Sequence, residues 1–415
     1  MENLKIKGEK AKKSSYVLAK LSPDAKNKAL ENAAKLILKR QDEIINANKK
    51  DLINAKDNGI NGALLDRLML NQNRIKSISE GLLQIAALND PTGEVISMKK
   101  MQNGLMIGQK RVPIGVIGII YEARPNVTVD AFGLCLKSGN AVILRGGKEA
   151  INSNIAIIEI LQDALLESNI PKESVQLVEN TSRESSIALM KLHEYLDVLI
   201  PRGGAALIQS VIKNSTVPVI ETGVGNCHIY IDVNTDMNMA TSIVNNAKTS
   251  RPGVCNAAET LLVHKDIAEE FLPQICLSLK KKNVEIRGDE IVKKIVPYVV
   301  QASEKDWATE YLDYIIAVKV VDSIDDAINH INTYGTKHSE AIITNNYHNS
   351  QRFLEEIDAA AVYVNASTRF TDGSEFGFGA EIGISTQKLH ARGPMGLKEL
   401  TSTKYIIYGN GQIRE

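Results

Sequence analysis

The sequence has 415 residues, of which 44% are hydrophobic and 24% are charged. This length corresponds to two or three domains at roughly 150 residues each, and the composition excludes wholesale disorder, collagen-like repeats and disulfide scaffolds. Lys plus Arg and Asp plus Glu both number 49, and aromatic residues make up 5%. A polyanion binder carries a basic excess, so we expect no nucleic acid partner and instead a small-molecule substrate.

Membrane and metal binding are both unsupported by the sequence. The longest apolar run, residues 112–121, is far shorter than the roughly 18 residues of a membrane span. The first residues lack the pattern of a signal peptide, which predicts a cytoplasmic protein with no membrane contact. The cysteines form no CxxC pair and have no histidine at ligand spacing, so we expect reduced thiols and no metal site. They are Cys135, Cys227, Cys255 and Cys276.

The elements predicted along the chain indicate an α/β protein. The first roughly 95 residues have helical periodicity, and Ser22-Pro23 has the pattern of a helix N-cap followed by proline. From residue 112 onward, short apolar strands alternate with helices, which predicts βαβ units and a parallel sheet. Ligands of such sheets bind beyond the carboxyl ends of the strands. The predicted strands are 112–121, 141–144, 175–178, 198–200, 217–220, 229–231, 261–263, 315–321, 341–343, 362–364 and 404–408, and the clearest helices are 127–137, 151–165 and 237–247.

Two glycine pairs follow predicted strands and precede helices. In Arg145-Gly146-Gly147-Lys148 and in Arg202-Gly203-Gly204, backbone N–H groups could approach a phosphate. The first segment fits neither the Walker nor the GxGxxG pattern, and for both segments an ordinary tight turn remains an alternative. The cations Arg145 and Lys148 would suit a ribose 2′-phosphate, which favours NADPH over NADH as the cofactor.

Two further residues could carry chemistry. Cys255 lies in Ser250-Arg-Pro-Gly-Val-Cys-Asn256, where proline and glycine predict a loop. A loop thiol near an arginine, or at a helix N-terminus, can become a nucleophile, although most cysteines are buried fillers. Glu221 ends a predicted strand beside glycines and could act as an acid or base, with a plain surface role as the alternative.

Taken together, these segments resemble the γ-glutamyl phosphate reductases, or glutamate-5-semialdehyde dehydrogenases, of the aldehyde dehydrogenase superfamily. The resemblance covers nearly the whole chain. The segments that carry it are Arg111 to Asn126, Gly139 to Lys148, Pro201 to Gly204, Ser250 to Ala258 and His390 to Lys404.

The resemblance implies a three-part architecture. A Rossmann-like parallel-sheet cofactor domain would span residues 1–222, and an α/β catalytic domain would span residues 223–388. Residues 389–415 would return to a small β oligomerisation element, which also contains a strand near 99–111. A homo-oligomer is therefore expected, and glutamate 5-kinase is a possible partner.

The resemblance also implies roles for individual residues. The expected reaction is the NADPH-dependent reduction of L-glutamate 5-phosphate to L-glutamate 5-semialdehyde and phosphate, in proline biosynthesis. Cys255 would form a thioester, Asn126 would hold the oxyanion and Glu221 falls at the position of the general base. The cofactor would contact Arg145, Gly146, Gly147, Lys148, Gly203, Gly204 and Glu310, and the anionic substrate would contact Arg124, Arg251 and Arg369.

Other functions remain open at this point. A hydrolytic NAD(P)-dependent aldehyde dehydrogenase would need a working base and no phosphate. An acyl-CoA-dependent reductase would need a CoA site, and a catalytically silent binding protein would have no reason to keep Cys255. A kinase, suggested by Gly146-Gly147-Lys148, is disfavoured by the failed Walker spacing.

Overall fold

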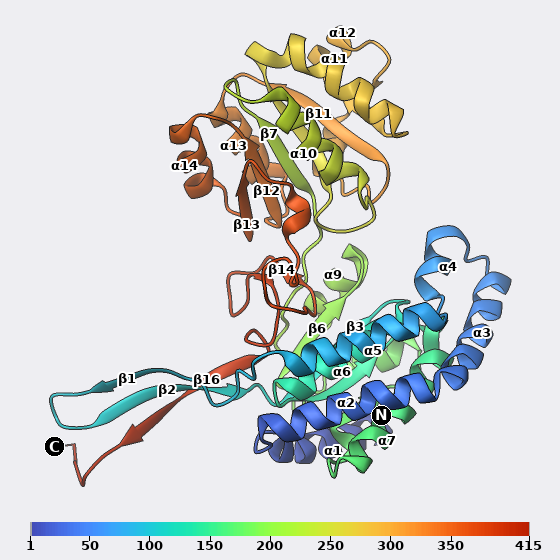
Figure 1. The fold of residues 1–415 in the computed structure, drawn as a ribbon, viewed down its shortest axis with the longest axis vertical. Coiled ribbons are helices and arrows are strands. Elements are labelled where there is room, and N and C mark those ends of the chain that lie inside the picture. Colours follow the sequence, from blue (N-terminus) through green and yellow to red (C-terminus); the bar gives the residue numbers. More distant parts are fainter. Residues whose placement is uncertain (1, 415) are drawn as a thin grey trace. The chain divides into compact units, whose positions relative to one another are not determined.

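A computed structural model describes residues 2–414, and it divides into two compact units (Figure 1). Unit 1 comprises residues 1–221, 377–383 and 395–415, and unit 2 comprises residues 222–376 and 384–394. The chain therefore leaves unit 1, builds unit 2 and returns. Each unit contains its own parallel β-sheet covered by helices.

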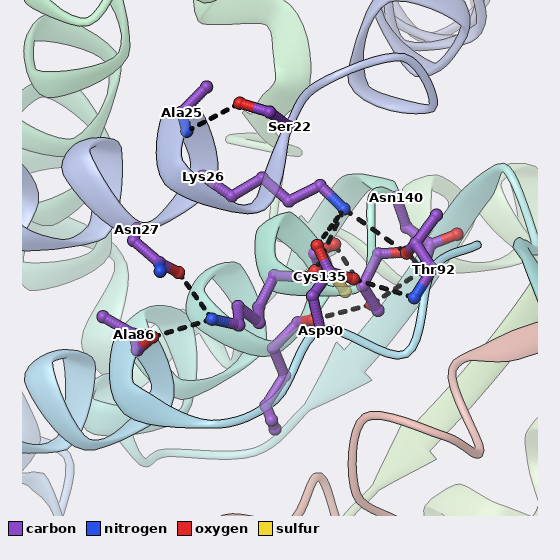
Figure 2. A network of polar contacts seen from close by, with 12 residues as sticks. Ser22, Ala25, Lys26, Asn27, Ala86, Asp90, Thr92, Cys135 and Asn140 are labelled. Carbon is purple, nitrogen blue, oxygen red and sulfur yellow. Dashed lines mark hydrogen bonds and ion pairs between the residues drawn. The ribbon is translucent and has the colours of Figure 1, made fainter. Parts of the chain in front are cut away.

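Unit 1 begins with a layer of helices, as the helical periodicity predicts. They are α1 (Glu2–Leu18), α2 (Pro23–Lys39), α3 (Gln41–Asp57), α4 (Gly62–Leu68) and α5 (Gln72–Ala87). The predicted N-cap is confirmed, because the Ser22 side chain accepts a hydrogen bond from the N–H of Ala25 at 3.2 Å (Figure 2). Helix α2 packs against α5, α6 and α7, of which α6 and α7 contact the sheet that follows.

The sheet of unit 1 is parallel, with the order β5-β4-β3-β6. Its strands are β3 (Val116–Tyr121), β4 (Ala141–Arg145), β5 (Val175–Leu177) and β6 (Val198–Arg202). The connecting helices are α6 (Pro125–Lys137), α7 (Ile151–Glu167), α8 (Arg183–Met190) and α9 (Ala205–Asn214), and the single-turn helices η1 (Lys148–Ala150) and η2 (Lys172–Ser174) precede α7 and β5. All of β3 is buried, which explains its unbroken apolar sequence.

Two predicted strands of unit 1 were wrong in extent. The run 112–121 is divided, because Gly115 adopts a φ of +133° and separates β3 from the preceding strand. Segment 217–220 forms only an isolated bridge, between Leu199 and Val219. Pro218 within it has no N–H to donate to a ladder, so the segment runs beside β6 without becoming a full strand.

A separate antiparallel sheet, with the order β1-β2-β16, also belongs to unit 1. Its strands are β1 (Val95–Lys100), β2 (Met106–Pro113) and β16 (Thr401–Tyr408). The range 99–111 thus holds the end of one strand, a turn and most of a second strand, rather than the single strand expected. Strand β16 pairs with β2 along its whole length, from Thr401 opposite Pro113 to Tyr408 opposite Met106.

Unit 2 is built on a seven-stranded sheet with the order β10-β9-β11-β8-β7-β12-β13, in which all pairs are parallel. The strands are β7 (Cys227–Ile231), β8 (Ala258–His264), β9 (Glu285–Gly288), β10 (Val300–Gln301), β11 (Ile315–Val321), β12 (Ser339–Ile343) and β13 (Ala361–Val364). The helices are α10 (Met237–Thr249), α11 (Lys265–Lys281), α12 (Glu290–Ile295), α13 (Ile324–Tyr334) and α14 (Tyr347–Glu356), with the short helices η3 (Glu304–Ala308) and η4 (Thr368–Phe370). A two-stranded pair, β14 (Ile384–Ser385) with β15 (Gly393–Pro394), completes the unit.

A buried polar network ties the helical layer of unit 1 together (Figure 2). The ammonium group of Lys26 lies 2.8 Å from the Asp90 carboxylate and 3.3 Å from the Lys137 carbonyl. The ammonium group of Lys137 donates to the Asn27 side chain and to the Ala86 carbonyl. Buried charges persist only when they are paired and hydrogen-bonded, and this network provides both.

Within residues 2–414, no helix combines the length and the apolar character that a bilayer span needs. In the same range, His, Cys, Asp and Glu side chains do not gather in any group of three or more that could hold a metal ion.

Candidate active site

In unit 1, the carboxyl ends of β4, β3 and β6 lie side by side, and a turn follows each of them. Strand order reverses between β3 and β6, and such a reversal opens a crevice beyond the sheet. Glu122, which follows β3, accepts a hydrogen bond from the N–H of Gly204 at 3.2 Å. A β-carbon at Gly203 would lie 2.6 Å from the same side chain, so any larger residue there would have to displace the Glu122 carboxylate. The predicted glycine turns are therefore neighbours at one edge of the sheet.

The two cations of the β4 turn have different surroundings. The Arg145 guanidinium donates to the carbonyls of Thr181 at 2.6 Å and Gly146 at 3.1 Å, and burial lowers its pKa. Lys148 begins the short helix η1 and is exposed. A β-carbon at Gly147 would lie 3.2 Å from the Ala123 backbone nitrogen, so the turn packs on the β3 loop. Arg145 thus holds the turn together, and Lys148 is the cation that the turn presents to solvent.

The first turn of α6 carries two predicted site residues. Arg124 is the N-cap residue of α6, and Asn126 lies in its first turn. The Asn126 amide nitrogen donates to the Asp130 carboxylate at 3.1 Å. Burial raises the pKa of Asp130 to about 6, against the opposing effects of that hydrogen bond and of Arg202. Glu221 is half-buried and is the last residue of unit 1 before the chain enters unit 2.

In unit 2, Cys255 lies on the loop that joins α10 to β8, and its side chain is partly exposed. The loop assignment is confirmed, but the cysteine is not at a helix N-terminus. It precedes a strand, so it lies at the amino end of the sheet, whereas the turns of unit 1 lie at carboxyl ends. The rule that ligands bind beyond the carboxyl ends of parallel strands therefore fits the glycine turns of unit 1 but not Cys255.

The Cys255 loop packs tightly on the segment before β7. A β-carbon on Gly225 would overlap the carbonyl oxygen of Cys255, so only glycine fits there. The N–H of Gly225 donates to the Glu310 carboxylate at 2.6 Å. Burial raises the pKa of Glu310, although the hydrogen bond from Gly225 acts in the opposite direction. The structure thus brings Glu310 next to the nucleophile loop, a relationship that spacing alone does not show.

Arginine side chains surround the same loop. The Arg369 guanidinium donates to the Asn256 side chain and, at 3.1 Å, to the Ser250 hydroxyl. Burial lowers the pKa of Arg369, and the nearby positive charge of Arg251 lowers it further. Cys255 favours the charged form of Arg369, because a thiolate there would attract the cation. Arg251 is exposed on the loop itself. Two cations are therefore available to an anion that approaches Cys255.

Sequence reasoning missed several residues that fix this loop. Lys248 lies in the last turn of α10 and Glu259 lies in β8, and their charged groups are 2.6 Å apart in a fully buried ion pair. This ion pair connects α10 to β8, the two elements that the Cys255 loop joins. Burial lowers the pKa of Lys248 and raises that of Glu259. Charged residues inside otherwise apolar elements were the available signal for it.

Comparison with known proteins places this geometry in a family. The model of the aldehyde dehydrogenase family matches residues 2–305 and 287–406. The chain belongs to the aldehyde dehydrogenase family. The predicted fold class and family are thereby confirmed, and the assignment implies a nicotinamide cofactor, NAD or NADP.

Several relatives are close over their full length. A protein of Clostridium botulinum, named γ-glutamyl phosphate reductase, is 65% identical over 414 residues and covers 100% of both chains. One of Caldicellulosiruptor bescii with the same name is 64% identical over 419 residues, again with 100% coverage of both chains. The crystal structure of γ-glutamyl phosphate reductase from Thermotoga maritima superimposes with a TM-score of 0.98 at 53% identity, covering 99% of this chain and 100% of that one.

More distant structures share the fold alone. An acetylating aldehyde dehydrogenase from Geobacillus thermoglucosidasius superimposes with a TM-score of 0.70 at 16% identity, covering 100% of this chain and 98% of that chain.

Proposed function

We propose that this chain catalyses the NADPH-dependent reduction of L-glutamate 5-phosphate to L-glutamate 5-semialdehyde and phosphate, the reductive step of proline biosynthesis. The observation that carries the proposal is the partly exposed Cys255 thiol on a loop that contains Arg251 and whose Asn256 side chain accepts a hydrogen bond from Arg369. A thiolate is the nucleophile that an acyl phosphate needs, and the arginines match the anionic phosphate and α-carboxylate. The names of the close, full-length relatives point to the same reaction.

In the proposed mechanism, the Cys255 thiolate attacks the acyl carbon, phosphate leaves and a thioester forms. The backbone N–H of Cys255 and, in our proposal, the Asn126 amide hold the oxyanion, and each such contact contributes roughly 3–4 kcal/mol. NADPH, when bound, supplies the hydride that reduces the thioester. Collapse of the resulting thiohemiacetal then releases the semialdehyde and restores the Cys255 thiolate. Because no water attacks the thioester, Glu221 need not act as a general base.

The unit 1 turns fit a dinucleotide cofactor. Gly203 and Gly204 are exposed after β6, and exposed Lys148 after β4 could pair with a 2′-phosphate, whereas Gly147 is buried and lets its turn pack on the β3 loop. We propose that Gly146 and the guanidinium of Arg145 shape this turn, and that Glu310 of unit 2 contacts the nicotinamide ribose. The predicted substrate contact of Arg124 stays a proposal of the same kind.

We also propose that the chain forms a homo-oligomer through the β1-β2-β16 sheet. This small sheet exposes several large apolar side chains, which isolated water-facing strands rarely do. They are Val95, Ile96, Met98, Tyr405, Ile407 and Tyr408. Because the acyl phosphate is labile, direct transfer from glutamate 5-kinase would be chemically useful. The thiolate chemistry suits the reducing cytoplasm.

The reverse reaction tests the proposed function. The protein is mixed with 1-pyrroline-5-carboxylate, the cyclic form of the semialdehyde, and NADP⁺, and NADPH absorbance is followed with and without inorganic phosphate. Reduction that requires phosphate supports the acyl phosphate reaction. Reduction without phosphate would identify a hydrolytic aldehyde dehydrogenase, and no reduction under either condition would refute the proposed substrate.

A further inference from the structure

A second cysteine lies directly beneath the nucleophile loop and has no part in the proposed chemistry. Cys227, the first residue of β7, is buried, and its thiol lies 3.1 Å from the carbonyl oxygen of Cys255 as the hydrogen-bond donor. Cys255 itself is partly exposed. The two cysteines thus differ in surroundings although one contacts the backbone of the other.

The surroundings of Cys227 keep its thiol protonated. Burial raises the pKa of Cys227 well above its ordinary value, and the nearby Glu340 carboxylate and Cys255 raise it further. An S–H group can donate a hydrogen bond to a carbonyl, whereas a thiolate cannot. The Cys227 thiol therefore stays protonated, and keeps its hydrogen bond to the Cys255 carbonyl, under conditions in which the Cys255 thiol must ionise.

The Cys227 thiol is held in place from its other side. His338 Nδ1 lies 3.8 Å from its sulfur and 2.8 Å from the Ser339 hydroxyl. The Ser339 hydroxyl in turn lies 2.7 Å from the hydroxyl of Thr371. This chain of polar contacts runs through the buried start of β12, and it leaves the Cys227 side chain little freedom to turn away.

The carbonyl that Cys227 contacts has a fixed place. The backbone of Gly225 packs against the Cys255 oxygen, and the N–H of Gly225 is held by the Glu310 carboxylate. Together these groups fix the plane of the peptide that follows Cys255. That plane sets the backbone ψ angle of Cys255, and the backbone in turn limits the rotamers open to its side chain.

We propose that Cys227 is a positioning residue, whose thiol anchors the Cys255 carbonyl and thereby aims the Cys255 sulfur at the acyl carbon. The inference rests on the proposed function in so far as Cys255 is the nucleophile. A small misplacement of a reacting group costs a large factor in rate, so a contact of this kind acts on the chemical step and not on substrate binding.

The test compares Cys227→Ala and Cys227→Ser with a matched control, Cys276→Ala. Cys276 is a fully buried thiol in α11 of the same unit, and its burial among apolar side chains raises its pKa in the same way. Cys227→Ala and Cys276→Ala thus each remove one buried sulfur atom, and only the first removes a donor to Cys255. Cys227→Ser keeps a donor at the site.

For the full-length protein in the phosphate-dependent reverse reaction, we expect Cys227→Ala to lower kcat about tenfold at an unchanged KM. We expect Cys227→Ser to remain within about threefold of the parent and Cys276→Ala to leave kcat unchanged. If Cys227→Ser is as slow as Cys227→Ala, or Cys276→Ala is equally slow, the cavity and not the donor is responsible, and the proposal is wrong.

A second readout does not depend on the substrate. Iodoacetamide carboxamidomethylates Cys255, and mass spectrometry measures the rate. We expect this rate to change about threefold or more in Cys227→Ala and to stay constant in Cys227→Ser and Cys276→Ala. An unchanged rate in all three variants would overturn the positioning role, even if the reverse reaction fails. Failure of the reverse reaction in the parent protein, with the alkylation pattern intact, would refute the proposed substrate and leave the positioning role standing.

Discussion

The α-carbon of Gly225 lies against the carbonyl oxygen of Cys255, and a single added methyl group would overlap that oxygen. The nucleophile loop can therefore occupy its observed place only while position 225 lacks a side chain. Two segments 30 residues apart in sequence fix each other in this way. The contact makes the loop before β7 a part of the candidate site, although it carries no reactive group.

We accordingly predict that Gly225→Ala displaces the Cys255 loop and lowers the reverse-reaction rate at least about a hundredfold. Gly81→Ala is the control, because a β-carbon at Gly81 in α5 meets no atom within 4 Å and alanine favours a helix. Steady-state rates and thermal unfolding of both variants check this. Full activity of Gly225→Ala would contradict this prediction, because it would show that the Cys255 loop can be displaced without loss of function.

Removal of the nucleophile and removal of the carboxylate should have unequal effects. Cys255→Ala should abolish phosphate-dependent turnover, because the proposed thioester forms on the Cys255 sulfur. Glu221→Ala should lose much less activity, because reduction of the thioester requires no activated water. Rates of the reverse reaction for the two variants check this, and equal losses would contradict the proposed mechanism.

Of the two cations of the β4 turn, we expect Lys148 to affect cofactor binding and Arg145 to affect the stability of the fold. Lys148→Ala should raise the KM for NADP⁺ about tenfold and leave the KM for NAD⁺ unchanged, because only NADP⁺ carries the 2′-phosphate. Arg145→Ala should instead lower the unfolding temperature, since its guanidinium holds the Thr181 and Gly146 carbonyls. Equal KM changes for both cofactors in Lys148→Ala would place the 2′-phosphate elsewhere.

The Asp130 carboxyl should make stability depend on pH. Its pKa of about 6 lies above the ordinary value, so between about pH 4 and pH 6 the folded protein keeps a proton that the unfolded chain releases. Its contribution to the free energy of unfolding therefore falls as pH rises through this window, by up to about 3 kcal/mol. Asp130→Asn should remove that slope, which urea unfolding at several pH values measures.

The buried ion pair between Lys26 and Asp90 should behave as a unit. Lys26→Met leaves the Asp90 carboxylate buried without its cation and should cost about 3–5 kcal/mol of unfolding free energy. The double variant Lys26→Met/Asp90→Leu should recover much of that loss. Chemical denaturation gives the three free energies, and additive losses would show that the two groups act independently.

Local patterns predicted much of the fold. The apolar strands from β3 to β8 and the helices between them follow from hydrophobic periodicity, and Ser22-Pro23 marked the start of α2 correctly. Segment 217–220 has strand composition, but Pro218 cannot join a ladder, so it pairs only at one bridge. The edge strand β10 and its neighbour β9 are short and partly polar, and periodicity does not detect such strands.

The sequence predicted individual residues of the candidate site, but it did not predict which of them lie next to one another. Motif resemblance selected Cys255 and Glu310, whose nearness depends on the parallel order of β7, β8 and β11 and on Gly225. The place of the Cys227 thiol beneath the Cys255 loop was not predicted, because a buried cysteine at a strand start has no sequence signal of its own. The different surroundings of Arg145 and Lys148 likewise depend on carbonyls far away in sequence.

Strand β2 pairs on one side with β1, its neighbour in sequence, and on the other with β16, which lies nearly 300 residues later. As the chain emerges from the ribosome, one edge of β2 stays without its partner strand β16 until all of unit 2 has been synthesised. An open strand edge is a template for pairing with other chains. The hairpin of the nascent protein is therefore open to aggregation until β16 is made, and unit 2 can fold before the sheet of β1, β2 and β16 is complete.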